Sequence, residues 1–156
     1  MKRELLLDGT IINDDSDCYV IAEIGHNHQG SMQMAKELIR AAKECGANAV
    51  KMQKRNNRGL YTKSLFNKPY DHENSFGETY GEHREFLEFG MTEYRELQRY
   101  AKEIQITLFA TPFDFESADF LAQLDMPAFK IASGDLQNIP LIQYIAKFQK
   151  PILIST

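Results

Sequence analysis

Two lysines stand inside apolar runs of the sequence, where a charged side chain is costly to bury. Lys51 lies within residues 49–53 and Lys130 within residues 128–132. Both runs follow predicted helices and are bounded by turn residues, so we interpret them as buried strands of a parallel sheet. An ammonium group in such a strand needs an anion beside it, unless its stem crosses the apolar region and its head reaches water. The pair therefore predicts an anion-binding site.

The elements that must position these lysines follow one another in a strand and helix order. The apolar runs predict five strands, at residues 19–25, 49–53, 107–113, 128–133 and 151–156. Helices are predicted between them: one that ends at Gly46, one capped by Thr92, and two over residues 116–124 and 140–148. Residues 1–13 predict a short β-hairpin, because Asp8 and Gly9 suit the positive φ of a tight turn.

Alternating strands and helices predict an α/β fold with a parallel sheet covered by helices, either an open doubly wound sheet or a (β/α) barrel. Glu23, Lys51, Thr111 and Lys130 each come late in a predicted strand. A barrel gathers the carboxyl ends of all its strands at one mouth, whereas an open sheet concentrates its ligand at one switch point. The spread of polar residues over four strands therefore favours a TIM-type barrel.

A complete barrel of this type has eight strands and roughly 250 residues. The sequence predicts only the first five strands in its 156 residues. We therefore expect one domain, with the hairpin at residues 1–13 and the first βα units at 19–156, that forms the front part of a longer protein. The alternative is a five-stranded open sheet that dimerises, since an unpaired sheet edge invites pairing.

The composition is that of an ordinary globular domain and argues against several classes of partner. Of the 156 residues, 43% are hydrophobic and 26% are charged, which is enough for one sizeable core. The formal net charge of -4 argues against a nucleic-acid surface. No stretch approaches the roughly 20 apolar residues of a membrane span, and the N-terminus lacks the apolar region of a signal peptide. Cys18 and Cys45 lack the spacing of a disulfide framework or a zinc knuckle, so we expect a cytoplasmic location.

The most specific local motif is Ile-Ala-Glu-Ile-Gly-His-Asn-His-Gln-Gly-Ser at residues 21–31, a strand that leads through a polar loop into a helix. Five further segments continue the pattern: residues 47–53, 79–84, 110–114, 129–135 and 154–156. With these segments in this order, nearly the whole chain resembles the sialic acid synthase family. Members of that family condense phosphoenolpyruvate with N-acetylmannosamine or a related N-acetylated amino sugar. The resemblance implies both compounds as substrates.

The resemblance also implies roles for individual residues. The phosphate and carboxylate of phosphoenolpyruvate would be held by five side chains: Lys51, Thr111, Lys130, Ser133 and Ser155. Two ammonium groups and three hydroxyls suit this small anion, because they supply charge-assisted hydrogen bonds from fixed strands. Gln53 corresponds to a residue that contacts the amino sugar. Asp135 is a weaker candidate for sugar contact, since an acidic residue at the start of a loop is often only a helix cap.

Glu23 corresponds to the family's glutamate beside the reacting carbons and is the candidate catalytic residue. In the implied reaction, the nucleophilic carbon of phosphoenolpyruvate attacks the open-chain sugar aldehyde, water adds to the resulting cation, and the tetrahedral intermediate loses phosphate. A carboxylate at this point stabilises the cation, or orients and deprotonates the water. The alternative is an ion pair between Glu23 and Lys51 that only neutralises a buried charge.

The resemblance implies a divalent metal, Mn²⁺ or Mg²⁺, that polarises the sugar aldehyde in the complete enzyme. The family's histidine ligands come from later barrel strands, so we expect no metal ligand within this chain. A C-terminal antifreeze-like domain, which reaches into the neighbouring subunit's site in the family's homodimers, is also expected to lie outside it. The 156 residues alone are therefore expected to lack metal binding and turnover.

Three alternatives to a synthase stay open. His26 and His28 follow the first predicted barrel strand, as in metal-dependent amidohydrolases, where Lys130 would be a carbamylated ligand; Glu23 and Lys51 would then have no evident role. Alternatively, both histidines only form hydrogen bonds within a loop. A Schiff-base aldolase would use a lysine whose pKa is depressed by a neighbouring cation. The third possibility is a non-catalytic binding or assembly module.

The segment at residues 55–90 is the least determined part of the chain. It is long for a barrel loop and rich in polar and aromatic residues, so we expect a lid, a dimer contact or partial disorder. Residues 80–84 within it resemble the bacterial synthases. Their alternative interpretation is the charged start of a helix.

Overall fold

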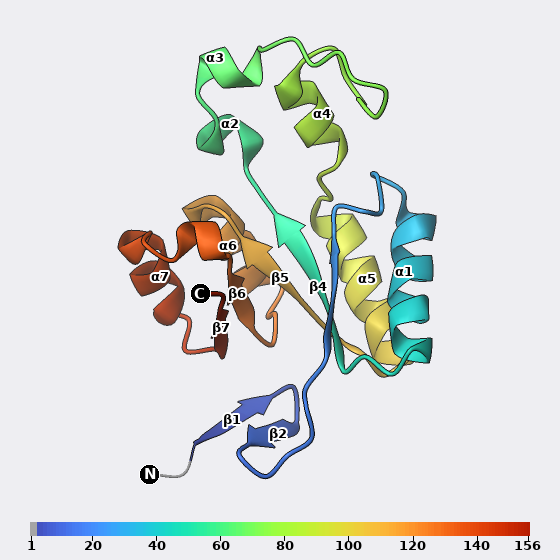
Figure 1. Cartoon of the computed structure of the whole chain (residues 1–156), viewed down its shortest axis with the longest axis vertical. Coiled ribbons are helices and arrows are strands. Elements are labelled where there is room, and N and C mark those ends of the chain that lie inside the picture. The colour runs from blue at the N-terminus through green and yellow to red at the C-terminus, as the bar shows by residue number, and fades with distance from the viewer. Residues whose placement is uncertain (1–2) are drawn as a thin grey trace.

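The computed structural model describes residues 3–156, and the first two residues of the predicted 1–13 hairpin lie outside that part (Figure 1). At its centre is a parallel sheet with five strands in sequential order: β3 (Ile21–Gly25), β4 (Ala49–Lys54), β5 (Thr107–Pro112), β6 (Phe129–Ile131) and β7 (Ile152–Ile154). A doubly wound sheet reverses its strand order at a switch point, and this sheet does not. The order is that of consecutive barrel strands.

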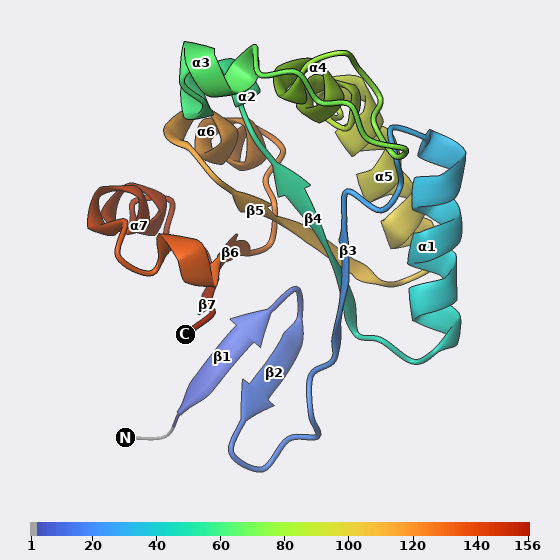
Figure 2. The ribbon, with the colours of Figure 1, turned by 45° about the horizontal axis from the view of Figure 1, so that its top comes forward.

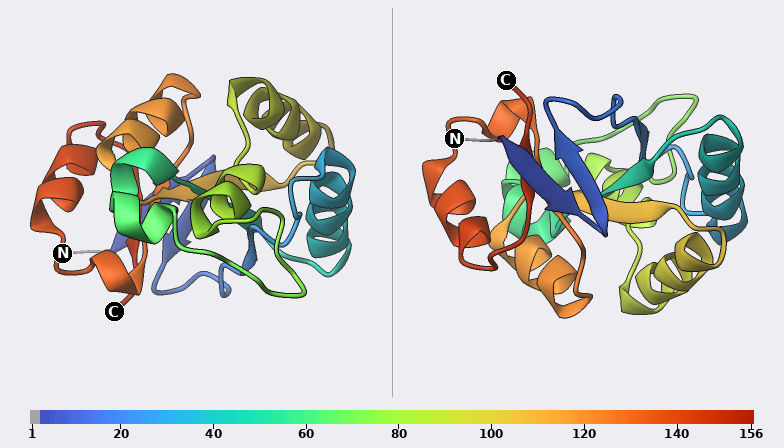
Figure 3. Two further views of the ribbon diagram at one scale, coloured as in Figure 1. Left: turned by 90° about the horizontal axis from the view of Figure 1, so that it is seen from above. Right: turned by 90° about the horizontal axis from the view of Figure 1, so that it is seen from below.

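The longer helices all pack against one face of this sheet. They are α1 (Met32–Glu44), α5 (Met91–Glu103), α6 (Phe115–Gln123) and α7 (Ile139–Ala146). Ile39, Leu97 and Leu121 from these helices form one buried core with Val50 and Met52 of β4. Figure 3 shows the helices arranged around the outside of the strands. The sheet therefore has a helix-covered outer face and an inner face, as a barrel requires.

The helix starts have identifiable caps, and one differs from the prediction. Ser31 accepts a hydrogen bond from the Met34 N–H at 3.2 Å to cap α1. Thr92 was expected to cap the helix that is α5, and this prediction is wrong. The helix begins after Gly90, whose N–H donates to the Glu93 side chain at 3.0 Å. The Glu93 side chain satisfies the backbone N–H of Gly90, which is the N-cap, so Thr92 lies inside the first turn of α5.

The predicted N-terminal hairpin is present and closes one end of the inner face. Strands β1 (Glu4–Leu7) and β2 (Thr10–Asn13) pair antiparallel around Asp8 and Gly9, both of which have positive φ. Leu7 is fully buried against Ala49, the first residue of β4, and Phe109 in the middle of β5. Figure 2 shows the hairpin beneath the sheet. Apolar side chains therefore fill the bottom of the barrel interior.

The segment at residues 55–90 contains three short helices and is not one irregular loop. It contains α2 (Asn57–Leu60), α3 (Lys63–Phe66) and α4 (Tyr80–Phe86). Thr79 and Glu82 form a capping box at the start of α4, so the interpretation of residues 80–84 as a helix start is confirmed. In Figure 1 these short helices lie at the end of the molecule opposite the hairpin, beyond the carboxyl end of β4. They cover part of the region where a barrel holds its active site.

Two further expectations are refined by the structure. The predicted strand at 128–133 shortens to β6, and a 3₁₀-helix, η1 (Ser133–Asp135), follows it. Cys18 and Cys45 are free, exposed thiols. Within residues 3–156, no helix combines the length and the apolar character that a bilayer crossing requires.

Candidate active site

The strand register brings the predicted residues onto the inner face of the sheet. Val50 and Met52 belong to the helix-covered core, so Lys51, which lies between them, projects to the opposite face. Pairing places Glu23 beside Lys51, and it places Gln53 beside Thr111. Four side chains from three adjacent strands therefore line one side of the interior, above the apolar layer that contains Leu7.

Lys51 is buried and paired. Its Nζ lies 2.5 Å from Glu23 Oε2, and the two side chains are 5% and 60% exposed. The interpretation in which the lysine head reaches water is therefore wrong for Lys51. The predicted ion pair exists, and its carboxylate side is open to solvent. Such an arrangement neutralises the buried amine while leaving Glu23 accessible to a ligand.

Lys130 lies on β6, which is separated from the strand of Lys51 by β5. Its Nζ donates to the Ile131 carbonyl at 3.0 Å and to the Ser155 hydroxyl. Burial lowers the pKa of Lys130 below its ordinary value; the charge of Glu23 opposes this change and the charge of Lys51 adds to it. The three charged groups therefore act on one another within one site.

Thr111 provides a hydroxyl that has no partner within the described chain. The residue is 1% exposed, and its Oγ1 forms no hydrogen bond. A buried hydroxyl without a partner costs about 1–3 kcal/mol relative to a satisfied one. A ligand oxygen bound between Lys51 and Lys130 is a chemically suitable partner for it.

Ser133 and Asp135 lie at the edge of this arrangement, on η1. Ser133 is exposed. Asp135 accepts a hydrogen bond from the Asn138 side chain at 3.3 Å, whereas Asn138 itself caps α7. In residues 3–156, the hydrogen bonds of neither predicted residue reach Lys51 or Lys130. The predicted site thus divides into an inner group and two residues on the rim.

A second polar cluster, which the sequence did not predict, lies at the carboxyl ends of β3 and β4. Glu88 Oε2 contacts Lys54 Nζ at 3.1 Å, and its other oxygen lies 3.2 Å from His26 Nε2. Arg55 donates to the Gln53 side chain at 2.8 Å. One nitrogen of Arg55 and one of Arg84 each lie 3.4 Å from His26 Nδ1. Gln53 therefore connects the inner site to this cluster.

The two histidines of the β3–α1 loop have different surroundings. His28 is 1% exposed, stacks on Phe89 with ring centroids 4.1 Å apart, and accepts a hydrogen bond from the Gly30 N–H at 3.1 Å. Burial lowers its pKa to about 4; His26 adds to this and Glu88 opposes it. Burial also lowers the pKa of His26, although Glu88 opposes that change. Both rings are neutral at pH 7.

This geometry does not support the amidohydrolase alternative. The Nδ1 of His26 faces two guanidinium groups, and a metal cation would be repelled there. Lys130 is bonded to Ser155 and to its own strand rather than to the histidines. Among the residues that the structure describes, no three His, Cys, Asp or Glu side chains converge on a possible metal position. The alternative in which both histidines only form hydrogen bonds within the loop fits His28, which bonds to Gly30. It is wrong for His26, which contacts Glu88 and two arginines outside the loop.

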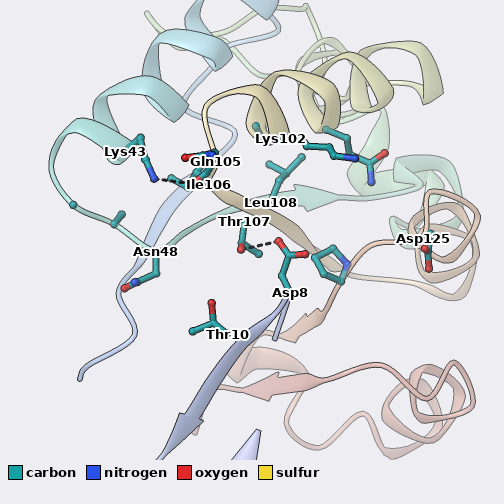
Figure 4. A pocket seen from close by; sticks show the side chains of 15 residues that line it. Asp8, Thr10, Lys43, Asn48, Lys102, Gln105, Ile106, Thr107, Leu108 and Asp125 are labelled. Atoms are coloured by element: carbon teal, nitrogen blue, oxygen red, sulfur yellow. Dashed lines mark hydrogen bonds between the residues drawn. The ribbon is translucent and has the colours of Figure 1, made fainter. Parts of the chain in front are cut away.

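A cavity of about 690 Å³ lies away from this chemistry (Figure 4). Its lining includes Asp8 and Thr10 of the hairpin and Gln105 and Thr107 at the start of β5. Thr107 Oγ1 donates to Asp8 at 2.8 Å across it. No predicted site residue lines this cavity. It lies where the hairpin meets the sheet, at the N-terminal ends of the strands. Residues at this end of a barrel serve stability, whereas the active site lies at the other end.

Comparison with known proteins identifies relatives of the whole chain. Residues 38–156 match the model of the NeuB family. The N-acetylneuraminate-9-phosphate synthase of Homo sapiens is 43% identical over 157 residues, which cover 100% of this chain and 44% of that protein. The N,N'-diacetyllegionaminic acid synthase of Legionella pneumophila is 39% identical over 140 residues, covering 89% of this chain and 39% of that protein.

The structural comparison agrees with the sequence matches. A crystal structure of the N-acetylneuraminic acid synthetase of Leptospira borgpetersenii, solved with citrate, superposes with a TM-score of 0.80 at 29% identity. The superposition covers 99% of this chain and 50% of that one. The chain thus spans about half, or less, of the length of these relatives. The predicted resemblance and the predicted α/β barrel-type fold are both confirmed.

Proposed function

The chain belongs to the NeuB family, and from this premise we propose that it supplies the phosphoenolpyruvate-binding part of a nonulosonic acid synthase. The complete enzyme would condense phosphoenolpyruvate with an N-acetylated amino sugar such as N-acetylmannosamine and release phosphate. The names of the relatives support this class of reaction, and they differ in the product, which is a 9-phosphate in the human protein and a legionaminic acid in Legionella. Both neutral and phosphorylated amino sugars are therefore candidates.

The observation that carries the proposal is the pair of lysines on the inner face. Lys51 and Lys130 approach from β4 and β6, with the unpartnered Thr111 hydroxyl on the strand between them. Phosphoenolpyruvate carries a phosphate and a carboxylate on a three-carbon frame, and two fixed ammonium groups match its two anionic ends. Ser155 already contacts Lys130, and Ser133 begins η1, three residues after Lys130 along the chain. We assign these five side chains to phosphoenolpyruvate.

In this proposal, the Glu23 carboxylate becomes available for catalysis when phosphoenolpyruvate binds. In the free protein its carboxylate neutralises Lys51. A phosphoenolpyruvate anion at Lys51 takes over this pairing and leaves the carboxylate beside the reacting carbons. There the nucleophilic carbon of phosphoenolpyruvate bonds to the aldehyde carbon, and the aldehyde oxygen takes up a proton to become a hydroxyl. Water adds to the cationic carbon, Glu23 accepts one proton of that water, and the remaining hydroxyl loses its proton as the product ketone forms. Cleavage of the carbon-oxygen bond then releases phosphate, with Gln53 and Asp135 proposed to contact the sugar.

A divalent metal is part of the proposal for the complete enzyme only. The described residues offer no converging set of His, Cys, Asp or Glu ligands, so this part of the chain does not fit the metal and no step is assigned to it. We propose that Mn²⁺ or Mg²⁺ is held by residues outside it, and that the complete enzyme is a cytoplasmic homodimer. Because the chain spans 44% of its human relative, we also propose that residues 1–156 alone do not turn over substrate.

The test is phosphate release from phosphoenolpyruvate by the full-length protein, with a panel of N-acetylated amino sugars and their 6-phosphates. We expect release to require one of these sugars. Glu23→Gln should lower kcat by about 100-fold or more with little change in the KM for phosphoenolpyruvate. The control Glu37→Gln, at an exposed position of α1, should keep wild-type rates. Absence of release with every sugar would overturn the synthase proposal and favour a non-catalytic binding module.

One observation favours a second candidate, the Schiff-base aldolase. The pKa of Lys130 is lowered by burial, and the charge of Lys51 contributes, which is how such enzymes activate a lysine. Its Nζ nevertheless donates hydrogen bonds to Ile131 and Ser155, which hold the amine as a donor. Borohydride reduction in the presence of pyruvate distinguishes the candidates. We expect no covalent adduct at Lys130, and a stable adduct there would favour the aldolase.

A further inference from the structure

Two arginines lie side by side at the carboxyl end of β4 without a carboxylate partner. Arg55 Nη1 and Arg84 Nη2 each lie 3.4 Å from the same atom, His26 Nδ1. Within residues 3–156, neither guanidinium group forms an ion pair with an Asp or Glu. Arg84 Nε is buried and has no hydrogen-bond partner there. The two like charges therefore repel each other at short range.

Glu88, the carboxylate that joins this cluster, is already engaged. Glu88 contacts Lys54 at 3.1 Å and His26 at 3.2 Å, and it accepts the backbone N–H of Arg55 at 3.2 Å. Its single negative charge is shared with Lys54. His26 supplies only a neutral ring, because burial holds its pKa below the ordinary value. The cluster keeps an excess of positive charge, which an anion would neutralise.

The geometry of the pair is that of a fixed receptor rather than of mobile surface side chains. Arg55 stacks on Phe113 at 3.8 Å from the ring centroid and donates to Gln53 at 2.8 Å, so the plane of its guanidinium group is set. Arg84 is carried by α4, which a capping box holds in place. Tyr61 and Tyr80 pack against each other with ring centroids 5.2 Å apart, and both lie near Arg55. Preorganised donors of this kind bind an oxyanion at low entropic cost.

The position of the pair relates it to the proposed substrates. Gln53 follows Lys51 by two residues on the same face of β4, so the two Cα atoms are about 6.6 Å apart along the strand. The Gln53 side chain contacts Arg55. A ligand that starts at the inner lysines and passes Gln53 therefore ends at the arginines. With phosphoenolpyruvate at the inner lysines, an amino sugar in contact with Gln53 could extend one end to the arginine pair.

We propose that Arg55 and Arg84 bind the phosphate group of a phosphorylated N-acylamino sugar, and that this pair sets the preference for a phosphorylated over a neutral sugar. The inference rests on the proposed function of the inner site. A phosphate dianion neutralises both guanidinium groups, and its oxygens accept the paired N–H donors of an arginine fork. It also provides an acceptor for Arg84 Nε. In the free protein, His26 Nδ1 lies beside one terminal nitrogen of each arginine and leaves Arg84 Nε without a partner.

The test is calorimetric binding of N-acetylmannosamine 6-phosphate and of N-acetylmannosamine to the full-length protein, with kcat/KM measured for each. We expect Arg84→Gln to weaken binding of the sugar phosphate by about 30-fold. Binding of the neutral sugar and the KM for phosphoenolpyruvate should stay within about 3-fold of wild type. Arg84→Lys, which keeps the charge, should recover part of the loss. The matched control is Arg58→Gln, which removes an exposed arginine that has its own partner, Glu85.

The outcomes separate the inference from the proposed function. Equal loss of affinity for both sugars would overturn the inference, since a structural role would affect them alike. A raised KM for phosphoenolpyruvate in Arg84→Gln would also overturn it, because the arginines would then hold the phosphate of that substrate. If the wild-type protein binds the neutral sugar and not the sugar phosphate, the inference is overturned, while the synthase proposal still stands. Selective loss of the sugar phosphate in Arg84→Gln supports it even if turnover fails, because binding is measured directly.

Discussion

At the scale of single residues, some polar groups of the inner site have an ion-pair or hydrogen-bond partner and one has none. Lys51 has Glu23, and Lys130 has Ser155, but Thr111 has a fully buried hydroxyl without a partner. The sequence predicted both lysines because a charged residue in an apolar strand is conspicuous. Arg55 and Arg84 gave no such signal, since they stand 29 positions apart in a polar segment without clear periodicity. Only the folded chain brings them together.

Replacement of Thr111 tests whether its hydroxyl serves a ligand. Thr111→Val removes the unpartnered hydroxyl and keeps the side-chain volume. We expect the free energy of unfolding of the ligand-free protein to rise by about 1 kcal/mol, because no hydrogen bond is lost. Phosphoenolpyruvate affinity should fall by about 10-fold. Urea denaturation and calorimetry measure the two effects.

The same substitution at Thr107 provides a control on the same strand. Thr107 is also buried, but its hydroxyl donates to Asp8 at 2.8 Å. Thr107→Val should therefore destabilise the protein by about 1 kcal/mol and leave phosphoenolpyruvate affinity unchanged. A stability loss in Thr111→Val as large as in Thr107→Val would show that the Thr111 hydroxyl has a structural partner.

At the scale of elements, the strands could be predicted because they lie in apolar runs bounded by turn residues, and the longer helices because each shows a periodic apolar pattern. The 55–90 segment could not, because α2 and α3 have four residues each and α4 has seven. Helices of this length carry too few apolar positions to reveal a period. The start of α5 was misplaced for another reason: Gly90 has no side chain to signal a cap, and Glu93 completes the motif from inside the helix.

The β3–α1 loop is held by His28, and this contact predicts how stability depends on pH. The pKa of His28 is about 4 in the folded protein, against 6.5 for the ordinary imidazole. Above pH 6.5 both folded and unfolded states keep the ring neutral, and its stabilising contacts are complete. Between pH 6.5 and 4 only the unfolded state takes up the proton, so stability is lost as pH falls. From pH 7.5 to 5 the loss from this residue is expected to reach up to about 2 kcal/mol.

His28→Asn isolates this contribution, because its side-chain oxygen replaces Nδ1 as the acceptor for the Gly30 N–H and does not titrate. We expect a variant that is less stable than wild type at pH 7.5, since the stacking on Phe89 is lost, but with a shallower decline toward pH 5. His72→Asn is the matched control, because the exposed His72 also accepts a backbone N–H. Equal pH slopes for His28→Asn and wild type in urea denaturation would contradict this account.

At the scale of the whole molecule, the fold places the candidate site between two covers. The hairpin closes the N-terminal end of the inner face, and the short helices of residues 55–90 lie beyond the carboxyl end of β4 (Figure 1). The longer helices occupy only the outer face. The sequence could predict this layout because sequential βα units allow few arrangements. It could not predict that Leu7 would seal the interior, since an apolar hairpin residue does not reveal which surface it meets.

The contribution of the hairpin can be measured with two neighbouring leucines. Leu7 is fully buried against Ala49, Phe109 and Ala128, whereas Leu6 is 60% exposed. Leu7→Ala should lower the free energy of unfolding by about 2–5 kcal/mol, because it leaves a cavity at the base of the interior. Leu6→Ala should change it by less than about 0.5 kcal/mol. Similar effects of the two substitutions in urea denaturation would show that the hairpin is not part of the core.

The central claim is that Lys51 and Lys130 together form the site for phosphoenolpyruvate. Calorimetric titration of phosphoenolpyruvate into the full-length protein tests it most directly, with Lys51→Met, Lys130→Met and, as control, Lys150→Met, whose exposed amine pairs with Asp125. We expect wild type and Lys150→Met to bind with equal affinity, and each inner-site variant to bind about 50-fold more weakly or worse. Wild-type affinity in both Lys51→Met and Lys130→Met would contradict the account.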